Sequence, residues 1–517
     1  MIINIYGAKC IGINAMPVTI EVDISSGIGI HLVGLADIAV KESLLRTMTA
    51  LQSLGFKIPG RKIVINLAPA DMHKSGSGYD LPIALGIIAA SGQSESKGLG
   101  KYLIMGELGL DGSVRDVPGA LPFVELAMQQ GLCGCILPTA SAMEAVEYTQ
   151  SVIFGVDSLN EVLKILEEKE DCSDLLIWNK PVSRRLKEET IKADNDFMDF
   201  SEIIGQEGAK RGLEIAAAGG HNVVMVGPPG SGKSSLAKAM SGILPPMSVE
   251  ESILTSKIYS VAGRGNNRYG LVRQRPFRAP HYSASVAAIV GGGNGDSIIP
   301  GEVSLAQNGI LFLDEFCELT KSAAEALRGP LEDRKVIISR LRSKVEYPAS
   351  FMLVAATNPC PCGYYGEGDK CVCTPGQRAS YIAKLSGPIM DRIDIHLWLH
   401  SVDPHKLVRN IRSETSAQVA SRVMAAREIQ SARLSGEGIF TNAEMNNRMT
   451  KRYCHLSEEC LDLLTKIITN GKLSARAYAR IVKLSRTIAD LAGSEDILPQ
   501  HITEASGLRF LDKVNLI

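Results

Sequence analysis

The feature that most constrains this chain is a glycine-rich segment at residues 227–234, which fits the pattern G-x-x-x-x-G-K-[ST]. The apolar run at residues 223–226 before it predicts a buried strand, and residues 235–240 after it predict the opening of a helix. A strand, a glycine loop and a helix are the context that this motif requires. Backbone N–H groups of such a loop surround a phosphate, and the helix N-terminus adds a positive dipole. The sequence therefore predicts a nucleotide-binding P-loop.

The residues of this loop have separate predicted roles. Lys233 is expected to reach the β- and γ-phosphates of ATP, and the Ser234 hydroxyl is expected to hold Mg²⁺. The other predicted nucleotide-binding residues are Gly227, Pro228, Pro229, Gly230, Ser231, Gly232 and Ser235. The alternative, a glycine loop that fits the pattern by chance, leaves the flanking strand and helix unexplained.

Two later segments are expected to complete the phosphate site. The apolar residues 310–313 precede Asp314 and Glu315, which predicts a buried strand that ends in two acids. Asp314 is then expected near the Mg²⁺ shell, and Glu315 is expected to polarise the attacking water. Residues 352–357 predict a further strand, and Asn358 at its end is expected to orient that water. The alternative for Asn358 is an ordinary turn residue before a proline.

Length and composition limit the remaining possibilities. A chain of 517 residues is too long for one core, so we expect several domains. The formal net charge of −1 gives no global signal for nucleic acid or membrane. The longest apolar run, near residues 81–90, is far shorter than the ~18 residues of a membrane span. With no visible signal peptide, the eleven cysteines are expected to be reduced and the chain to be cytoplasmic, with no membrane partner.

The order of P-loop, Asp-Glu strand, polar strand end and arginine segment resembles that of AAA+ ATPases. The segments at residues 275–285, 291–293, 300–306 and 386–394 resemble the magnesium-chelatase-like branch of that class. Together with the front of the chain, the resemblance extends nearly end to end to the YifB/ComM family. It implies an α/β fold: an AAA+ P-loop core at residues 198–400 and a helical lid at residues 401–517. A charged linker is expected at residues 167–197.

The front segment, residues 1–166, resembles the α+β proteolytic domain of Lon proteases. Lon-type proteases use a serine after a Lys-x-Gly turn and a later lysine as base. Here the serine's position falls within residues 78–80, and Ser77 is one step out of register. No lysine occurs between Lys101 and Lys164, so a positioned base is missing. We therefore expect a domain that keeps the fold without the Ser-Lys dyad and acts as a scaffold.

The family resemblance also implies a ring, a homo-oligomer expected to be a hexamer, with each nucleotide between two subunits. Arg392 is then expected to reach a neighbour's γ-phosphate, where a fixed guanidinium neutralises developing charge. Arg476 matches the lid arginine that senses the same phosphate from within its own subunit. The alternative for each arginine is a surface salt bridge.

Residues 334–347 predict two strands around a basic tip. In this branch of AAA+ proteins an inserted hairpin projects into the ring pore. Arg340, Arg342 and Lys344 are expected to follow a DNA phosphate backbone there without recognising sequence. The alternative is a solvated hairpin. In the lid, Val419, Val423 and Ala426 predict the buried face of a helix, and Arg422, Arg427 and Arg433 are expected to be solvated.

Four cysteines follow Asn358 closely, as the pairs Cys360 and Cys362 and, after eight intervening residues, Cys371 and Cys373. Four such thiols can close a tetrahedral Zn²⁺ site. The Cys-x-Cys spacing is tighter than the usual Cys-x-x-Cys, so reduced loop cysteines remain the alternative.

The sequence thus predicts an ATP-hydrolysing AAA+ motor, and the resemblance implies that it acts on single-stranded or branched DNA as a branch-migration helicase in recombination. The rival is a chelatase-type ATPase that remodels a protein partner. A chelatase subunit is expected to lack the front domain, whose presence therefore argues against metal insertion into porphyrins. An ATP-dependent protease would need the missing dyad.

Overall fold

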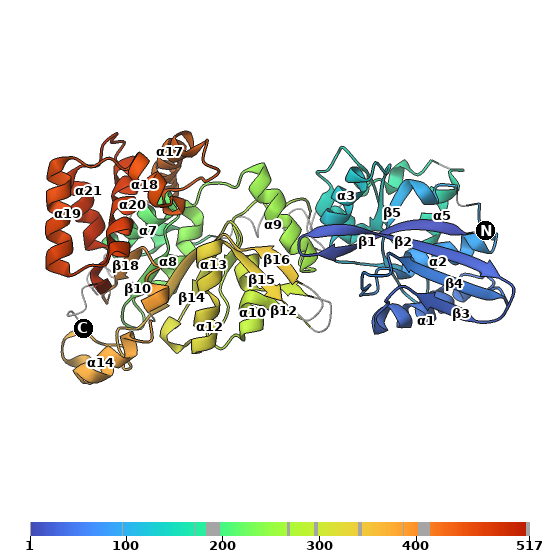
Figure 1. Ribbon diagram of the computed structural model, residues 1–517, viewed down its shortest axis with the longest axis horizontal. Helices are drawn as coiled ribbons and strands as arrows, with labels where there is room; N and C mark the ends of the chain where they lie inside the picture. The colour runs from blue at the N-terminus through green and yellow to red at the C-terminus, as the bar shows by residue number, and fades with distance from the viewer. Residues whose placement is uncertain are drawn as a thin grey trace.

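The computed structural model describes residues 2–95, 97–169, 171–181, 197–265, 269–293, 298–339, 344–385, 387–401 and 414–512. Figure 1 shows an elongated molecule with a mixed α/β front unit at one end, the P-loop core in the middle and a helical lid at the other end. The fold is therefore of the mixed α/β class that the sequence predicts.

The front unit is built on a seven-stranded sheet of order β3-β4-β2-β1-β5-β8-β9. Its strands are β1 (Ile3–Ile11), β2 (Asn14–Ser25), β3 (Ile30–Val33), β4 (Lys62–Ala68), β5 (Tyr102–Ile104), β8 (Gly134–Pro138) and β9 (Val152–Val156). A small hairpin pairs β6 (Glu107–Leu108) with β7 (Val114–Arg115), and the helices are α1 (Ile38–Ser53), α2 (Asp80–Ala90), α3 (Ala120–Gln129), α4 (Thr139–Ala142) and α5 (Leu159–Glu167). The apolar run near residues 81–90 lies in α2, most of whose residues are buried.

The middle unit holds a five-stranded sheet of order β11-β14-β17-β10-β18 in which every pair is parallel. Its strands are β10 (Val223–Val226), β11 (Phe277–Arg278), β14 (Ile310–Leu313), β17 (Met352–Thr357) and β18 (Ile395–Trp398). Because parallel strands all end at the same edge, the segments after β10, β14 and β17 meet there. These three neighbouring strands are the ones predicted to carry the P-loop, the acid pair and Asn358, and all three predictions of strands are confirmed.

Helices and short strands surround this sheet. The helices are α7 (Glu207–Gly219), α8 (Lys233–Met240), α9 (Val249–Val261), α10 (Val286–Val290), α11 (Glu302–Leu305), α12 (Lys321–Ala326), α13 (Arg328–Asp333), α14 (Pro375–Ile382) and α15 (Gly387–Met390). The short strands form the antiparallel pairs β12 (Gly291–Gly292) with β13 (Ile299–Pro300) and β15 (Lys335–Ser339) with β16 (Lys344–Pro348). The second pair confirms the predicted hairpin, whose residues 340–343 lie outside the described part of the chain.

The lid consists of α17 (Ser416–Leu434), α18 (Asn447–Tyr453), α19 (Glu458–Gly471), α20 (Ala475–Leu491) and α21 (Pro499–Gly507). It shares one apolar core with α7, α8 and one face of the sheet, so lid and core are packed together. The prediction that the arginines of α17 are solvated is wrong. Arg427 donates to the carbonyl of Ala217 at 2.9 Å, and Arg433 pairs with the buried Asp490 at 3.0 Å. These side chains tie α17 to α7 and α20, because the helix packs across both.

The front unit and the P-loop core are joined mainly through α9. Lys257 of that helix pairs with Glu125 of α3 at 2.6 Å, and the Ser260 carbonyl accepts from the Gly119 N–H at 3.0 Å. The segment predicted as a solvated linker begins inside the front unit, because Ile177 is fully buried in its core and donates its N–H to Ile153. Residues 182–196 of that prediction lie outside the described residues. Among the described helices, none is both long and apolar enough to cross a bilayer.

Candidate functional site

The predicted P-loop residues gather in one cavity at the carboxyl edge of the parallel sheet. The cavity has a volume of about 460 Å³ and is lined by residues 229–235 together with Asp314, Glu315, Thr357 and Asn358. Ser234 donates its hydroxyl proton to Asp314 at 2.9 Å. The P-loop, the acid pair and the polar strand end therefore converge as the spacing predicts, although they lie more than a hundred residues apart at the extremes.

The loop backbone leaves room for a phosphate. Gly230 and Gly232 have φ angles of +76° and +87°, and a Cβ at either position would meet nothing within 4 Å. The hydroxyl of Ser231 is buried and has no hydrogen-bond partner among the described residues. The eight-residue helix α8 begins directly at Lys233, so its free N–H groups face the same space. An open loop with an unpaired buried hydroxyl fits a phosphate ligand.

Lys233 is held across the site. Its ammonium donates to the carbonyls of Gly227 at 2.7 Å and Pro228 at 2.9 Å and to the Asn358 side-chain oxygen at 3.3 Å. Burial lowers the pKa of Lys233, and the nearby charges of Asp314 and Glu315 oppose that shift. A bound polyphosphate would add negative charge beside this ammonium and favour its charged form.

The acid pair is placed by a strained turn at the end of β14. Glu315 has a φ of +48°, in the left-handed region that is costly for residues with a Cβ, and its N–H donates to Asp314 at 2.9 Å. Such strain is common where a site needs a side chain in an exact direction. Mg²⁺ prefers oxygen ligands, and Ser234 with Asp314 would supply them; the bound ion would neutralise phosphate charge.

Arg392 and Arg476 lie elsewhere, together, in a second cavity of about 260 Å³ lined by residues of α13, α20 and the segment before β18. Arg392 pairs with Glu332, and Arg476 pairs with Asp391. The P-loop cavity is lined by neither arginine. Within one subunit, the geometry therefore brings these two arginines to each other and not to the nucleotide site.

Three residues that sequence analysis did not single out hold the Arg392 segment in place. Asn222 donates its side-chain amide to the Arg392 carbonyl at 2.9 Å, and Arg480 of α20 pairs with Asp394. His221, fully buried, contacts Asp394 at 3.2 Å and Thr487 at 2.8 Å. The segment is thereby linked both to the base of the P-loop strand and to the lid. No local pattern marks these residues, because their partners come from distant parts of the chain.

One of the three predicted DNA-binding residues and all four predicted zinc ligands lie in the described part of the chain. Arg340 and Arg342 lie outside the described residues, whereas Lys344 is exposed at the start of β16. The β15–β16 hairpin buries Val336, Ile338, Val345 and Tyr347 against the core and leaves its other face open. The four cysteine sulfurs all lie within 4.8 Å of one another.

A third and larger cavity, of about 1020 Å³, is lined by residues of the front unit and the core, and these include Gly78 and Tyr79 of the segment 78–80 where the serine of Lon proteases is expected. The neighbouring Ser77 donates its hydroxyl proton to Glu107 rather than to a lysine. The same cavity is bordered by Val345 and Tyr347 of the hairpin.

Comparison with known families agrees with this geometry. A family model described as magnesium chelatase, subunit ChlI, matches residues 199–407; one described as subunit ChlI of Mg-chelatase matches residues 20–141; and one for the C-terminal part of subunit ChlI matches residues 413–509. Fold, site and matches together define a magnesium-chelatase-like AAA+ ATPase, a class that hydrolyses ATP with Mg²⁺.

Two full-length relatives define the family. The chain is 41% identical to the protein YifB of Salmonella typhimurium over 99% of this chain and 97% of that protein. It is 41% identical to the competence protein ComM of Haemophilus influenzae over 98% of this chain and 97% of that protein. The chain belongs to the YifB/ComM family.

Two further matches are relevant to the protease and chelatase alternatives. An archaeal Lon protease of Halobacterium salinarum is 45% identical over 53 residues, which is 10% of this chain and 8% of that protein. Such a short stretch does not define a domain. The model that matches residues 20–141 carries a chelatase description, so the presence of a front unit does not by itself argue against a chelatase role.

Proposed function

We propose that this chain is a ring-forming AAA+ motor that acts on DNA, as a branch-migration helicase that aids recombination of incoming DNA. The observation that carries the proposal is the similarity to the competence protein ComM, which extends over 98% of the chain and includes the front unit, the core and the lid. A ring-forming helicase needs ATP hydrolysis, contacts between neighbouring subunits and a DNA-contacting element. The P-loop cavity, the paired arginines of the second cavity and the basic hairpin supply candidates for each.

The ring explains why Arg392 and Arg476 lie away from the P-loop of their own subunit. In a ring of identical subunits, a surface that carries two arginines can meet the nucleotide cavity of the next subunit. Arg476 is largely exposed, with 68% of its side chain accessible, so a neighbour's phosphate can compete with Asp391 for it. We therefore replace the expected role of Arg476 within its own subunit by a role in the neighbouring site.

Subunit mixing distinguishes the two roles of Arg476. An Arg476→Ala ring is expected to bind ATP and to hydrolyse it slowly in either case. If Arg476 acts on the neighbour, mixing it with Lys233→Ala subunits restores some complete sites and therefore ATPase activity. If Arg476 acts within its own subunit, that mixture stays inactive, while a mixture with Arg392→Ala recovers. Steady-state phosphate release from the mixtures, with subunit exchange verified by labelled chains, decides between them.

The hairpin supports DNA as the substrate. Its register pairs Ser339 with Lys344, so the three basic residues of the prediction cluster at or next to the turn. One face of the hairpin is anchored in the core by Val336, Ile338, Val345 and Tyr347, and the other face, which carries Lys344, is exposed. Phosphate contacts of this kind are indifferent to sequence and weaken with salt. We also propose that the front unit has a Lon-protease-like fold without the Ser-Lys dyad and serves as a scaffold beside the hairpin.

The proposal is tested by the ATPase rate of the full-length protein without DNA and with single-stranded, duplex and forked DNA. Forked or single-stranded DNA is expected to stimulate ATP turnover. A labelled four-way junction is expected to be separated into duplex products by branch migration in the presence of ATP. Absence of stimulation by every DNA would contradict the proposal and favour the rival, a chelatase-type ATPase that remodels a protein partner.

Replacing Arg340, Arg342 and Lys344 together by Ala is expected to abolish DNA stimulation while leaving basal ATPase activity in place. Each lost phosphate contact on a single strand removes about 0.7 from the slope of log K against log salt concentration, or about 2 for three contacts. The matched control removes three exposed lysines elsewhere, Lys321, Lys451 and Lys466, and should retain both stimulation and slope. Stimulation that persists in the hairpin variant would place the DNA contact elsewhere, for example on the front unit.

A further inference from the structure

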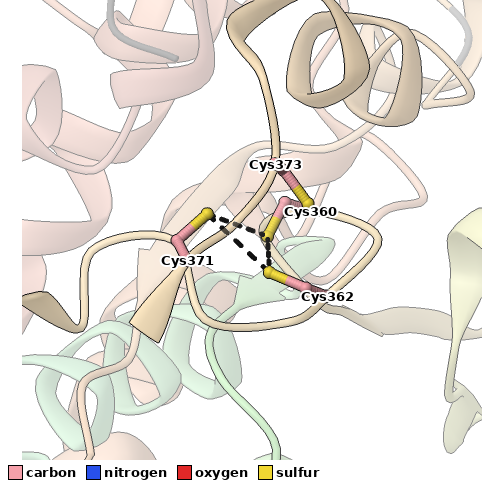
Figure 2. Close-up of side chains that lie close together, drawn as sticks. All are labelled: Cys360, Cys362, Cys371 and Cys373. Atoms are coloured by element: carbon pink, nitrogen blue, oxygen red, sulfur yellow. Dashed lines mark hydrogen bonds between the residues drawn. The ribbon is translucent and has the colours of Figure 1, made fainter. Parts of the chain in front are cut away.

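The loop that follows Asn358 brings four cysteine side chains together at one point. Figure 2 shows Cys360 and Cys362 from the beginning of the loop facing Cys371 and Cys373 from its end. The sulfur of Cys360 lies 3.3 Å from that of Cys362 and 3.9 Å from that of Cys371, and the sulfurs of Cys362 and Cys371 are 3.7 Å apart. Two segments of the loop thus converge through sulfur atoms alone.

These separations fit thiols that share a metal ion and do not fit a disulfide. A disulfide needs sulfurs about 2.05 Å apart, which none of the measured pairs approaches. Four thiolates around Zn²⁺ at about 2.3 Å occupy the corners of a tetrahedron whose edges are about 3.8 Å. Two of the three measured distances lie within 0.2 Å of that edge, and all four sulfurs fall inside 4.8 Å. The set is also all-sulfur, which soft metal ions prefer.

The loop has few buried residues of its own. Between the end of β17 and the start of α14, in residues 358–374, Pro359, Cys360 and Gly363 are the buried positions. The side chain of Val372 is 82% exposed, which shows that the far part of the loop has no apolar core to enter. A long segment without a hydrophobic core needs another source of stability, and a bound structural metal ion can supply it.

The same loop lies against the nucleotide site. Gly363 has a φ of +86°, and a Cβ there would lie 2.9 Å from the Pro229 ring of the P-loop. Tyr365 meets Trp398 of β18 edge-on, with ring centroids 6.3 Å apart, and the Arg378 guanidinium lies over the Tyr365 ring at 4.2 Å from its centroid. The loop therefore connects the end of β17, where Asn358 contacts Lys233, with the P-loop and with β18.

We propose that Cys360, Cys362, Cys371 and Cys373 bind one Zn²⁺ as four thiolates, releasing their protons on binding, and that this ion is structural. By closing the loop, the metal fixes Asn358 and Pro229 relative to each other and so positions the site for ATP hydrolysis. The proposal that the four cysteines bind Zn²⁺ depends only on the positions of the sulfur atoms. The proposal that the metal positions Asn358 and Pro229 also depends on the proposed ATPase function of the P-loop site. Zinc suits the structural task because it has no redox chemistry of its own.

Metal content tests whether the four cysteines bind Zn²⁺. Full-length protein, purified without a polyhistidine tag, is expected to contain about one zinc per chain by elemental analysis. Cys362→Ser and Cys373→Ser are expected to lose most of it, while Cys133→Ser, which removes an exposed thiol far from the loop, should keep it. Protein grown with Co²⁺ should show the intense near-ultraviolet thiolate-to-cobalt absorption of a tetrahedral site. Metal-free wild-type protein, iron with acid-labile sulfide, or full zinc in the serine variants would overturn the assignment.

Removing the metal and adding it back tests whether it positions the site for ATP hydrolysis. Stripping wild-type protein with a thiol-reactive mercurial, and then reversing the reaction with excess dithiothreitol, is expected to lower ATP turnover more than binding of a fluorescent ATP analogue. Turnover should return with added Zn²⁺ and not with Mg²⁺ alone. Turnover that is unchanged by metal loss would overturn the positioning role. A zinc-loaded protein that never hydrolyses ATP would instead contradict the ATPase function, with the metal site intact.

Discussion

The Arg392→Ala variant is expected to bind ATP and to assemble, but to hydrolyse ATP about 10³–10⁵-fold more slowly than the wild type, the loss typical of a missing arginine finger. The reason is electrostatic, because a fixed guanidinium neutralises charge that develops on the phosphoryl oxygens in the transition state. The arginine has 10% of its side chain accessible, and its backbone is held by Asn222, so it is already ordered before a neighbour arrives. Phosphate release at saturating ATP measures the effect.

A matched variant separates this role from a structural one. Arg392 pairs with Glu332, whose side chain is 64% exposed, so the alternative is that Arg392 only makes a surface ion pair. Glu332→Gln removes that pair and leaves the guanidinium in place. If Arg392 is a finger, Glu332→Gln should keep nearly full activity, since an exposed pair contributes little stability. Equal losses in the two variants would instead support the structural role.

Mixing experiments test whether the finger acts between subunits. Lys233→Ala subunits have an inactive nucleotide cavity and an intact Arg392, and Arg392→Ala subunits have an intact cavity and no Arg392 side chain. In a ring that contains both variants, some sites combine an intact nucleotide cavity with an intact Arg392 from the neighbouring subunit. ATPase activity should therefore reappear if one complete site can hydrolyse ATP independently of the others. Continued inactivity, with exchange of subunits demonstrated, would mean that Arg392 acts within its own subunit or that the ring fires only as a whole.

Lys233→Ala and Glu315→Gln are both expected to be inactive, for different reasons. Lys233 is the ammonium directed into the P-loop cavity, and loss of a charge-assisted contact of this kind is expected to weaken ATP binding roughly 10- to 100-fold. Glu315 lies at the mouth of the cavity on a strained turn, and loss of a general base lowers turnover about 10²–10⁴-fold. Glu315→Gln should therefore bind ATP normally and trap it.

Each of these variants has a control on the same element. Lys238 is exposed on the last turn of α8, and Glu318 is exposed three residues after Glu315. Lys238→Ala and Glu318→Gln change the same charges outside the cavity and should bind and hydrolyse ATP as the wild type does. Nucleotide affinity by fluorescence titration and turnover by phosphate release are the two measurements. Wild-type turnover in Glu315→Gln would remove this residue from the water-activating role.

The nucleotide site was predictable from the sequence because its signals are local. A P-loop needs a strand, glycines and a helix in immediate succession, and each feature is visible within 227–240 or just before it. The strands before Asp314 and Asn358 were predictable from short apolar runs, and the rule that parallel strands end at one edge brings them to the same cavity. Four closely spaced cysteines were likewise visible as a group.

Other features were not predictable from the sequence, because they depend on partners that are distant in the chain. Arg422, Arg427 and Arg433 look solvated along one helix, and only the packing of α17 on α7 and α20 gives them partners. The contact of the cysteine loop with Pro229 follows from the parallel pairing of β17 with β10. Arg476 could be matched to a lid arginine by its local pattern, but whether it faces its own nucleotide site depends on how the lid is docked. The sheet and lid place it beside Arg392, because a long-range docking angle is set by the sum of many packing contacts and not by any one stretch of sequence.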